Sequence, residues 1–376
     1  MALLFTDCVA RARRVVVKIG SSVLTQGGLR IDRGHLGHLA EELHRVRATG
    51  REVGVVSSGA IALGVEILGQ AARKPGLAAK QAAAAVGQCQ LIVLWQDAFR
   101  GHGTRVAQVL LTHADLASRQ RFLNARHTMN ELFAEGVLPI INENDTVAVE
   151  EIQFGDNDHL AALVTSLIEA DLLVLLTDVD GLYDRDPKET GARLIPVVEE
   201  VDDDTLRLAK GAGTLIGTGG MRSKVEAART AAHFGVPTVV ANGRSPGTLS
   251  ALLRGGETGT LFLPRESPVG ARKHWIAFTL RPAGTLVVDP GAVRALREGK
   301  RSLLPAGVVE VQGEFDVGDA VRVVGPDGVE IARGLASYGA RELERIRGKA
   351  SSEIERALGY RYDDEAIHRD DLVLLG

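Results

Sequence analysis

The sequence predicts an α/β domain with a mostly parallel sheet sandwiched by helices, followed by a small, mainly β-barrel or sandwich domain. Short apolar runs without polar alternation recur up to residue 240, and helical patterns separate them. Unbroken Val, Ile and Leu suits strands that are buried on both faces, as in parallel sheets. After residue 273 the pattern changes to short strands between Pro- and Gly-rich turns, which favours a second, β-rich domain.

Each element of the first domain follows from its local pattern. The apolar runs expected to form strands are 15–19, 53–56, 106–111, 137–141, 172–176 and 236–240. The segments with helical spacing, the first of them capped by Asp32, are 33–48, 80–99, 118–135, 158–169 and 221–234. Because strands and helices alternate, helices are expected on both faces of the sheet.

The second domain is expected to begin after a boundary near 264–273. Its expected strands are 275–280, 285–289, 308–311, 320–324 and 329–332, with short helices at 292–298 and 341–347. The predicted division is therefore 1–265 for the first domain and 275–376 for the second.

Composition excludes several classes of protein. The 376 residues carry a formal net charge of −4, which gives no overall attraction to nucleic acid. The two cysteines, Cys8 and Cys89, lie far apart without metal-ligand spacing, which favours a reducing, cytoplasmic compartment. The apolar residues 1–5 come before the first charged residues, which is the reverse of a signal peptide, and no apolar run is expected to be long enough to span a membrane.

Two distant lysines end short runs that are typical of phosphate-binding loops. Lys18 closes the apolar run that begins at Arg14, and Lys224 closes the glycine-rich run 217–224. Phosphoryl transfer depends on positioning and charge neutralisation, so lysines and backbone amides around an oxyanion are the expected equipment. Walker A, Rossmann and protein-kinase signatures are missing, so ATP would be bound by another route.

Polar clusters follow the expected strands, where ligands of open α/β sheets bind. Ser57 and Ser58 offer hydroxyls and backbone amides to an anion, although an ordinary helix start explains them as well. Residues 142–145, Asn-Glu-Asn-Asp, suit an ammonium group, and a solvated turn is the alternative.

Two acidic segments complete the set. Asp158 is expected to cap the helix that follows it and to orient the two lysines through ion pairs. Thr177 and Asp178 follow the most apolar run and are candidates for contact with a nucleotide or its metal ion. A calcium loop is excluded because Tyr183 stands where an EF-hand requires glycine.

The motifs together, in this order and at strand ends, resemble the glutamate 5-kinase family of the amino acid kinase superfamily, and the C-terminal part resembles a PUA domain. The similarity runs nearly end to end. The matching stretches are 16–25, 57–61, 142–145, 155–158, 177–183 and 217–224.

The resemblance implies a reaction in which ATP phosphorylates the γ-carboxylate of L-glutamate to L-glutamyl 5-phosphate, the first step of proline biosynthesis. It implies Mg²⁺ on the phosphates, feedback inhibition by L-proline at or overlapping the glutamate site, and no metal held by the protein alone. A homo-oligomer is also expected. Neither a nucleic acid partner nor a membrane is expected.

The resemblance also implies residue roles. Lys18 and Lys224 would stabilise charge on the transferring phosphoryl group, and Asp158 would hold both lysines. Ser58, Asp145 and Asn157 would bind glutamate. The ATP contacts would be Lys18, Thr177, Asp178, Thr218, Gly219, Gly220, Met221, Arg222, Ser223 and Lys224.

The chemistry agrees with this assignment. A γ-carboxylate is already ionised near neutral pH, so the reaction needs no protein base, and no His or Cys constellation is seen. Arg222 departs from the smaller or polar residue expected in the family. It either contacts nucleotide or faces solvent.

Two other functions stay open from the sequence. One is a carboxylate kinase for acetylglutamate or aspartate, which residue patterns do not distinguish. The other is an RNA-binding PUA protein, which the charge of the second domain disfavours: from Trp275 onward 14 basic residues stand against 17 acidic ones, a balance of −3.

Overall fold

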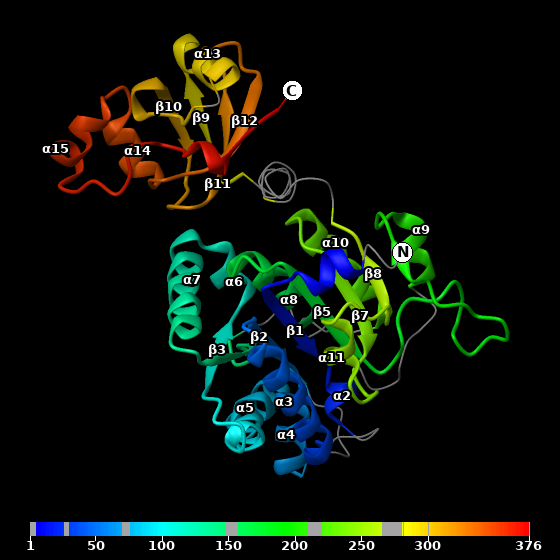
Figure 1. Ribbon diagram of the computed structural model, residues 1–376. Coiled ribbons are helices and arrows are strands. Elements are labelled where there is room, and N and C mark those ends of the chain that lie inside the picture. Colours follow the sequence, from blue (N-terminus) through cyan, green and yellow to red (C-terminus); the bar gives the residue numbers. More distant parts are fainter. Residues whose placement is uncertain are drawn as a thin grey trace. The chain divides into compact units, whose positions relative to one another are not determined.

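The computed structural model describes residues 5–25, 30–69, 76–147, 157–209, 220–264, 280, 282–299 and 301–375. The chain divides into two compact units, Met1–Leu116 with Asn124–Glu266, and Ser267–Gly376 with Ala117–Leu123 (Figure 1). Residues 265–279 lie outside the described residues. They include nearly all of the predicted domain boundary near 264–273, so its exact position stays a prediction.

The first unit is built on one eight-stranded sheet with the order β3-β4-β2-β1-β5-β7-β8-β6. All pairings are parallel except β7 with β8. The strands are β1 (Arg14–Ile19), β2 (Glu52–Ser57), β3 (Val106–Leu111), β4 (Leu138–Glu143), β5 (Leu172–Thr177), β6 (Val197–Val198), β7 (Thr238–Asn242) and β8 (Thr260–Phe262). The six expected strands and the mostly parallel sheet are confirmed.

Helices cover both faces of this sheet, as expected (Figure 1). A π-helical turn, Thr6–Ala10, precedes β1. The helices are α2 (Ser21–Leu24), α3 (Arg33–Ala48), α4 (Ala60–Ile67), α5 (Leu77–Arg100), α6 (His113–Ala117), α7 (Arg119–Ala134), α8 (Asn157–Leu167), α9 (Asp203–Leu208), α10 (Met221–His233) and α11 (Thr248–Leu252). Asp32 caps α3 as predicted, since its side chain accepts a hydrogen bond from the His35 amide.

Strand alternation decides which side chains meet which helices. Val15, Val17 and Ile19 of β1 belong to the core formed with α3, α5 and α11. Lys18 therefore points to the opposite face, because successive side chains of a strand alternate. There α8 packs against β1, β2 and β5, while α10 packs against β5 and β7.

The second unit has its own core and a five-stranded sheet of order β10-β9-β11-β12-β13, with β9 and β11 parallel and the other pairs antiparallel. The expected strand 275–280 lies outside the described residues except for Leu280. The elements are β9 (Gly284–Val288), α13 (Pro290–Gly299), β10 (Val308–Gly313), β11 (Ala320–Val324), β12 (Glu330–Leu335), α14 (Ala340–Ile346), α15 (Ile354–Leu358) and β13 (Leu372–Leu374), with 3₁₀ turns at Pro305–Gly307, Ser351–Glu353 and Arg369–Asp371.

Helix α5 corrects one expectation. Its 24 residues contain an 18-residue window of mean hydropathy 1.3, so by length and composition alone it is able to cross a bilayer. Four glutamines and Lys80 interrupt the apolar residues of this helix, so the sequence shows no continuous apolar run. The inner face of α5 nevertheless places Leu91, Trp95 and Phe99 in the core of the first unit.

Helices α4 and α5 approach closely because two glycines leave room for backbone. A Cβ on Gly87 would lie 1.8 Å from the Ala60 carbonyl oxygen, and one on Gly64 would lie 1.7 Å from the Ala83 carbonyl oxygen. No L side chain fits at such distances without separating the helices.

We expect Gly87→Ala to destabilise the protein by about 1–3 kcal/mol or more, because a buried methyl group would force the two helices apart. Gly37→Ala is the matched control: no atom lies within 4 Å of its added Cβ in the interior of α3. That change should stabilise the helix by about 0.8–1 kcal/mol. Urea unfolding of both variants measures the difference, and equal effects would contradict the close-approach argument.

Candidate functional site

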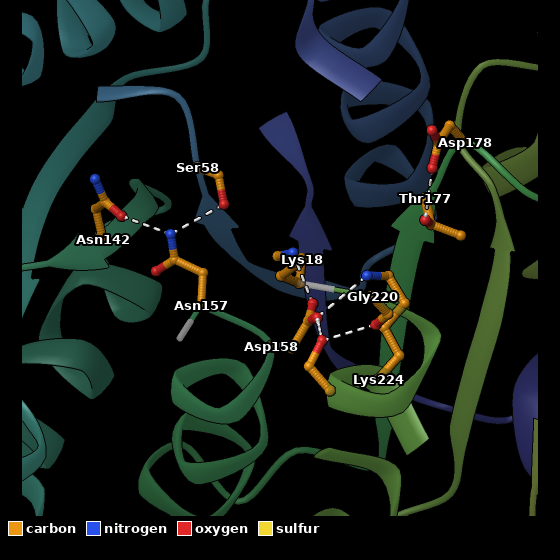
Figure 2. Close-up of polar contacts among 10 residues, drawn as sticks. Lys18, Ser58, Asn142, Asn157, Asp158, Thr177, Asp178, Gly220 and Lys224 are labelled. Atoms are coloured by element: carbon orange, nitrogen blue, oxygen red, sulfur yellow. Dashed lines mark hydrogen bonds and ion pairs between the residues drawn. The ribbon is translucent and has the colours of Figure 1, made fainter. Parts of the chain in front are cut away.

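The carboxyl edge of the parallel strands places the candidate residues in a defined order. Because the strands are ordered β4-β2-β1-β5, Asn142, Ser58, Lys18 and Thr177 follow one another along this edge. Residues at the carboxyl ends of parallel strands share one side of the sheet, where ligands of α/β proteins bind. Segments up to 206 residues apart, Lys18 and Lys224 among them, are thus brought into one site (Figure 2).

Two lysines bind the two oxygens of a single carboxylate. The Lys18 Nζ lies 2.6 Å from Asp158 Oδ1, and the Lys224 Nζ lies 3.2 Å from Asp158 Oδ2 (Figure 2). The exposed fractions of the residues are 5% for Lys18, 4% for Lys224 and 0% for Asp158. The ion pairs predicted for Asp158 are present, and all three charges are withdrawn from water.

The expectation that Asp158 caps the following helix is wrong. The residue lies inside the first described turn of α8, which begins at Asn157. Its carboxylate is taken up by the lysines and by Ser223, whose Oγ lies 2.6 Å from Asp158 Oδ2 and 2.8 Å from the Gly220 carbonyl oxygen. A cap oxygen normally accepts from amides of its own helix.

Burial and charge act in opposite directions on these groups. Burial alone would raise the pKa of Asp158, but the Lys18 and Lys224 ammonium groups and the hydrogen bonds from Lys18 and Ser223 hold that pKa far below its usual range. Burial lowers the pKa of Lys18, Asp158 partly offsets this, and the neighbouring Lys224 lowers the pKa further. With both ammonium groups charged, the triad carries a net charge of +1.

On one side of the triad, amide side chains form a hydrogen-bonded chain. The Asn157 Nδ2 donates to Ser58 Oγ and to Asn142 Oδ1, each at 3.0 Å (Figure 2). The Asn142 Nδ2 donates in turn to Gln88 Oε1 of α5 at 2.7 Å. Asp145, half-buried, lies in the turn that follows β4, three residues after Asn142.

Sequence reasoning placed Ser58 and Asn157 correctly in one group but missed Gln88. The Asn-Glu-Asn-Asp run drew attention to Asn142, whereas Gln88 is one of four glutamines in an Ala-rich helix. Periodicity shows that position 88 lies on the buried face, and it gives no indication of the hydrogen-bond partner.

On the other side of the triad lies the end of β5. The buried Thr177 donates to Asp178 Oδ1 at 3.2 Å (Figure 2). A small apolar pocket lies beside this strand end and the start of α10; its lining includes Val179, Leu182, Pro187, Leu208 and Met221.

The glycine-rich segment is described from Gly220 onward; Thr218 and Gly219 lie outside the described residues. Arg222 is exposed, and its Nε lies 2.8 Å from Glu226 Oε1 on the same helix. Of the two interpretations of Arg222, this geometry favours the solvent-facing one.

Among the described residues, no group of three or more His, Cys, Asp or Glu side chains is arranged to hold a metal ion. Mg²⁺ is commonly held by one or two carboxylates together with substrate phosphates.

Comparison with known proteins agrees with the geometry. The model of the amino acid kinase family matches residues 13–242, and that of the PUA domain matches residues 284–358. The glutamate 5-kinase of Geobacter sulfurreducens is 52% identical over 367 residues, covering 97% of this chain and 98% of that protein. Those of Trichlorobacter lovleyi and Myxococcus xanthus are 53% and 52% identical, each over 97% of both chains.

Three findings lead to one assignment. The chain has two compact units, it places a triad of buried charges at the carboxyl edge of a parallel sheet, and its sequence is about half identical to these enzymes over nearly the whole length. The chain belongs to the glutamate 5-kinase family of amino acid kinases and carries a PUA domain.

Proposed function

We propose that this enzyme transfers the terminal phosphoryl group of ATP to the γ-carboxylate of L-glutamate, forming ADP and L-glutamyl 5-phosphate for proline biosynthesis. The observation that carries the proposal is the buried Lys18–Asp158–Lys224 triad between an amide-rich strand end and the β5 end. Its relatives of half-identical sequence are named glutamate 5-kinases.

The triad suits transfer between two anions. The nucleophile is a carboxylate, which is ionised near neutral pH and needs no general base. Two ammonium groups offset the repulsion between this carboxylate and the phosphates, and they stabilise the charge that spreads over the transferring group. Asp158 does not react: its carboxylate pairs with both ammonium groups and holds them close together.

The two substrates would lie on opposite sides of the triad. Ser58, Asp145 and Asn157 would bind glutamate, since hydroxyl and amide donors suit its carboxylates and acceptor oxygens suit its ammonium group. ATP would lie along Thr177, Asp178 and residues 218–224, with Lys18 and Lys224 at its terminal phosphate. Mg²⁺ would neutralise charge on the phosphates, held mainly by their oxygens.

The test is ADP release by the full-length enzyme with ATP, Mg²⁺ and, in turn, L-glutamate, L-aspartate and N-acetyl-L-glutamate. Hydroxylamine present during the reaction traps an acyl phosphate as a hydroxamate. We expect the highest kcat/KM and hydroxamate formation with L-glutamate. A higher kcat/KM with either of the other acids would overturn the assignment.

L-Proline is the proposed inhibitor, acting at or overlapping the glutamate site, because it shares the α-carboxylate and amino nitrogen of glutamate. We expect L-proline to raise the apparent KM for glutamate and to leave the kcat at saturating glutamate unchanged. Initial rates over a grid of both amino acids measure this. A fall in kcat with an unchanged KM would place the inhibitor elsewhere.

We also propose a homo-oligomer in the cytoplasm. Both cysteines, Cys8 and Cys89, are free thiols, which suits a reducing compartment. Helix α5 and the end of α4 carry exposed apolar side chains that a second copy would cover: Ile67, Leu68, Leu77, Val86 and Val93.

If a second copy covers this surface, Val86→Glu will shift the enzyme to a smaller species, because a buried unpaired charge opposes association. Size-exclusion chromatography with light scattering measures the mass. Val309→Glu, a change at an exposed valine of the second unit, is the matched control and should leave the mass unaltered. The same mass for all three proteins would move the interface away from α5.

A further inference from the structure

Gln88 is a buried polar residue that the roles assigned so far do not use. Its side chain belongs to α5 and is 8% exposed. Gly87, its neighbour, lies against the Ala60 carbonyl at the start of α4, which immediately follows Ser58 and Gly59. This close approach fixes the position of Gln88 along α5 relative to Ser58, just after the end of β2.

The hydrogen bond from Asn142 to Gln88 sets the direction of the whole amide chain. Because Gln88 Oε1 accepts from Asn142 Nδ2, the Asn142 oxygen is turned toward Asn157. Asn157 then donates with both of its N–H groups, one to Asn142 and one to Ser58. Since the Ser58 hydroxyl accepts at its oxygen, its own proton is left to donate to a carboxylate.

Two atoms of this chain point to an incomplete network. The Gln88 Nε2 and the Asn157 Oδ1 are buried and have no hydrogen-bond partner among the described residues. Buried polar atoms are seldom left unsatisfied, so the chain is built for a further polar group. The ammonium group of an amino acid would supply the donor that the Asn157 Oδ1 lacks.

A second contact supports a positioning role for this face of α5. The Trp95 Nε1 donates to the buried Ser57 Oγ at 2.9 Å. Trp95 lies seven residues after Gln88, about two helical turns, so both side chains leave the same face. Helix α5 thus holds the end of β2 through Ser57 and the end of β4 through Asn142.

We propose that Gln88 is a positioning residue for the amino acid substrate: it fixes which atoms of Asn142, Asn157 and Ser58 face that substrate. The inference rests on the proposed carboxylate kinase activity and deepens it. Without the Gln88 oxygen, the Asn142 amide is free to turn over, and its NH₂ group would then oppose the NH₂ group of Asn157. The donor to Ser58 would lose its orientation, while the ATP side would be untouched.

The experiment compares Gln88→Met, which keeps the length of the side chain and removes both hydrogen-bonding atoms, with the wild type. We expect the KM for the amino acid to rise on the order of tenfold, since a buried amide loses its partner. The kcat and the KM for ATP should stay within about twofold of the wild type, because the change lies outside the triad. Gln96→Met, at an exposed position of the same helix, is the matched control and should change none of these constants.

A double-mutant cycle separates positioning from general damage. In an Asn142→Ala background, Gln88→Met should not raise the KM further, because Gln88 acts through Asn142. Additive effects would overturn the inference. Equal rises in the KM for the amino acid and the KM for ATP, together with a lowered thermal midpoint, would overturn it as well.

The amino acid in these assays is whichever one the wild type phosphorylates best. A wild type that prefers another acid to glutamate would therefore overturn the proposed function alone. An unchanged KM in Gln88→Met would overturn the positioning role alone.

Discussion

Replacing Lys224 with alanine will raise the activation free energy by about 2–4 kcal/mol, which lowers the kcat roughly 30- to 900-fold. The residue is 4% exposed, so bulk water screens the charges around it only weakly. Lys18 and Asp158 would remain as an ion pair of net charge zero, whereas the intact triad carries +1. The developing negative charge would then meet one cation fewer, in a site where charge interactions are strong.

Steady-state kinetics with ATP and glutamate varied separately measures this loss. The KM for ATP should change less than the kcat, because the other phosphate contacts proposed above would remain and the missing charge would act mainly in the transition state. Arg229→Ala removes a cation from an exposed position of the same helix and should leave the kcat within about twofold. A Lys224→Ala enzyme with the kcat of the wild type would remove Lys224 from the mechanism.

The parts predicted well from the sequence share one physical cause. Runs 15–17 and 172–176 are apolar at every position because both faces of a parallel strand are covered, and this signal is local. Polar residues placed directly after such runs must lie at one edge of the sheet. For this reason the sequence alone predicts that Lys18 and Thr177 lie at one edge of the sheet.

Other parts depend on tertiary contacts that leave little trace in the sequence. The two-residue β6 and the three-residue β8 are strands because they pair with each other, not because of their own composition. Gln88 differs from the other glutamines of α5 in that β4 ends opposite it. The local sequence predicts that Asp158 is a helix cap, since Asp is favoured at that position. The two lysines that form ion pairs with its carboxylate come from distant segments and leave no local signal.

Removing Asp158 will have the largest effect on stability. Asp158→Ala should lower the free energy of unfolding near neutral pH by about 3–5 kcal/mol, because it leaves two buried ammonium groups facing each other without an anion. Lys224→Ala should cost less, since it leaves a matched pair. Asp97→Asn, in an exposed ion pair with Arg100, is the control and should stay within about 0.5 kcal/mol of the wild type.

The pH dependence identifies the cause. The pKa of Asp158 is lower in the folded protein than its unfolded value of about 3.9, so the unfolded chain binds more protons in acid. The stability that Asp158 contributes is thus present above about pH 4 and is lost as the pH falls toward its folded pKa. Lys18 has a lowered folded pKa, so its burial opposes folding at neutral pH and ceases to do so as the pH rises and the ammonium group loses its proton.

Urea unfolding of the wild type and of Asp158→Asn across the accessible pH range tests both signs. The amide keeps the shape of the carboxylate without its charge, so the difference in unfolding free energy isolates the electrostatic part. That difference should be largest near neutral pH, and it should narrow toward acid, where Asp158 becomes protonated, and toward alkali, where Lys18 loses its charge. A difference that is independent of pH would mean that Asp158 stabilises the fold through packing and hydrogen bonds, and the two ammonium groups would then not depend on its charge to share one site.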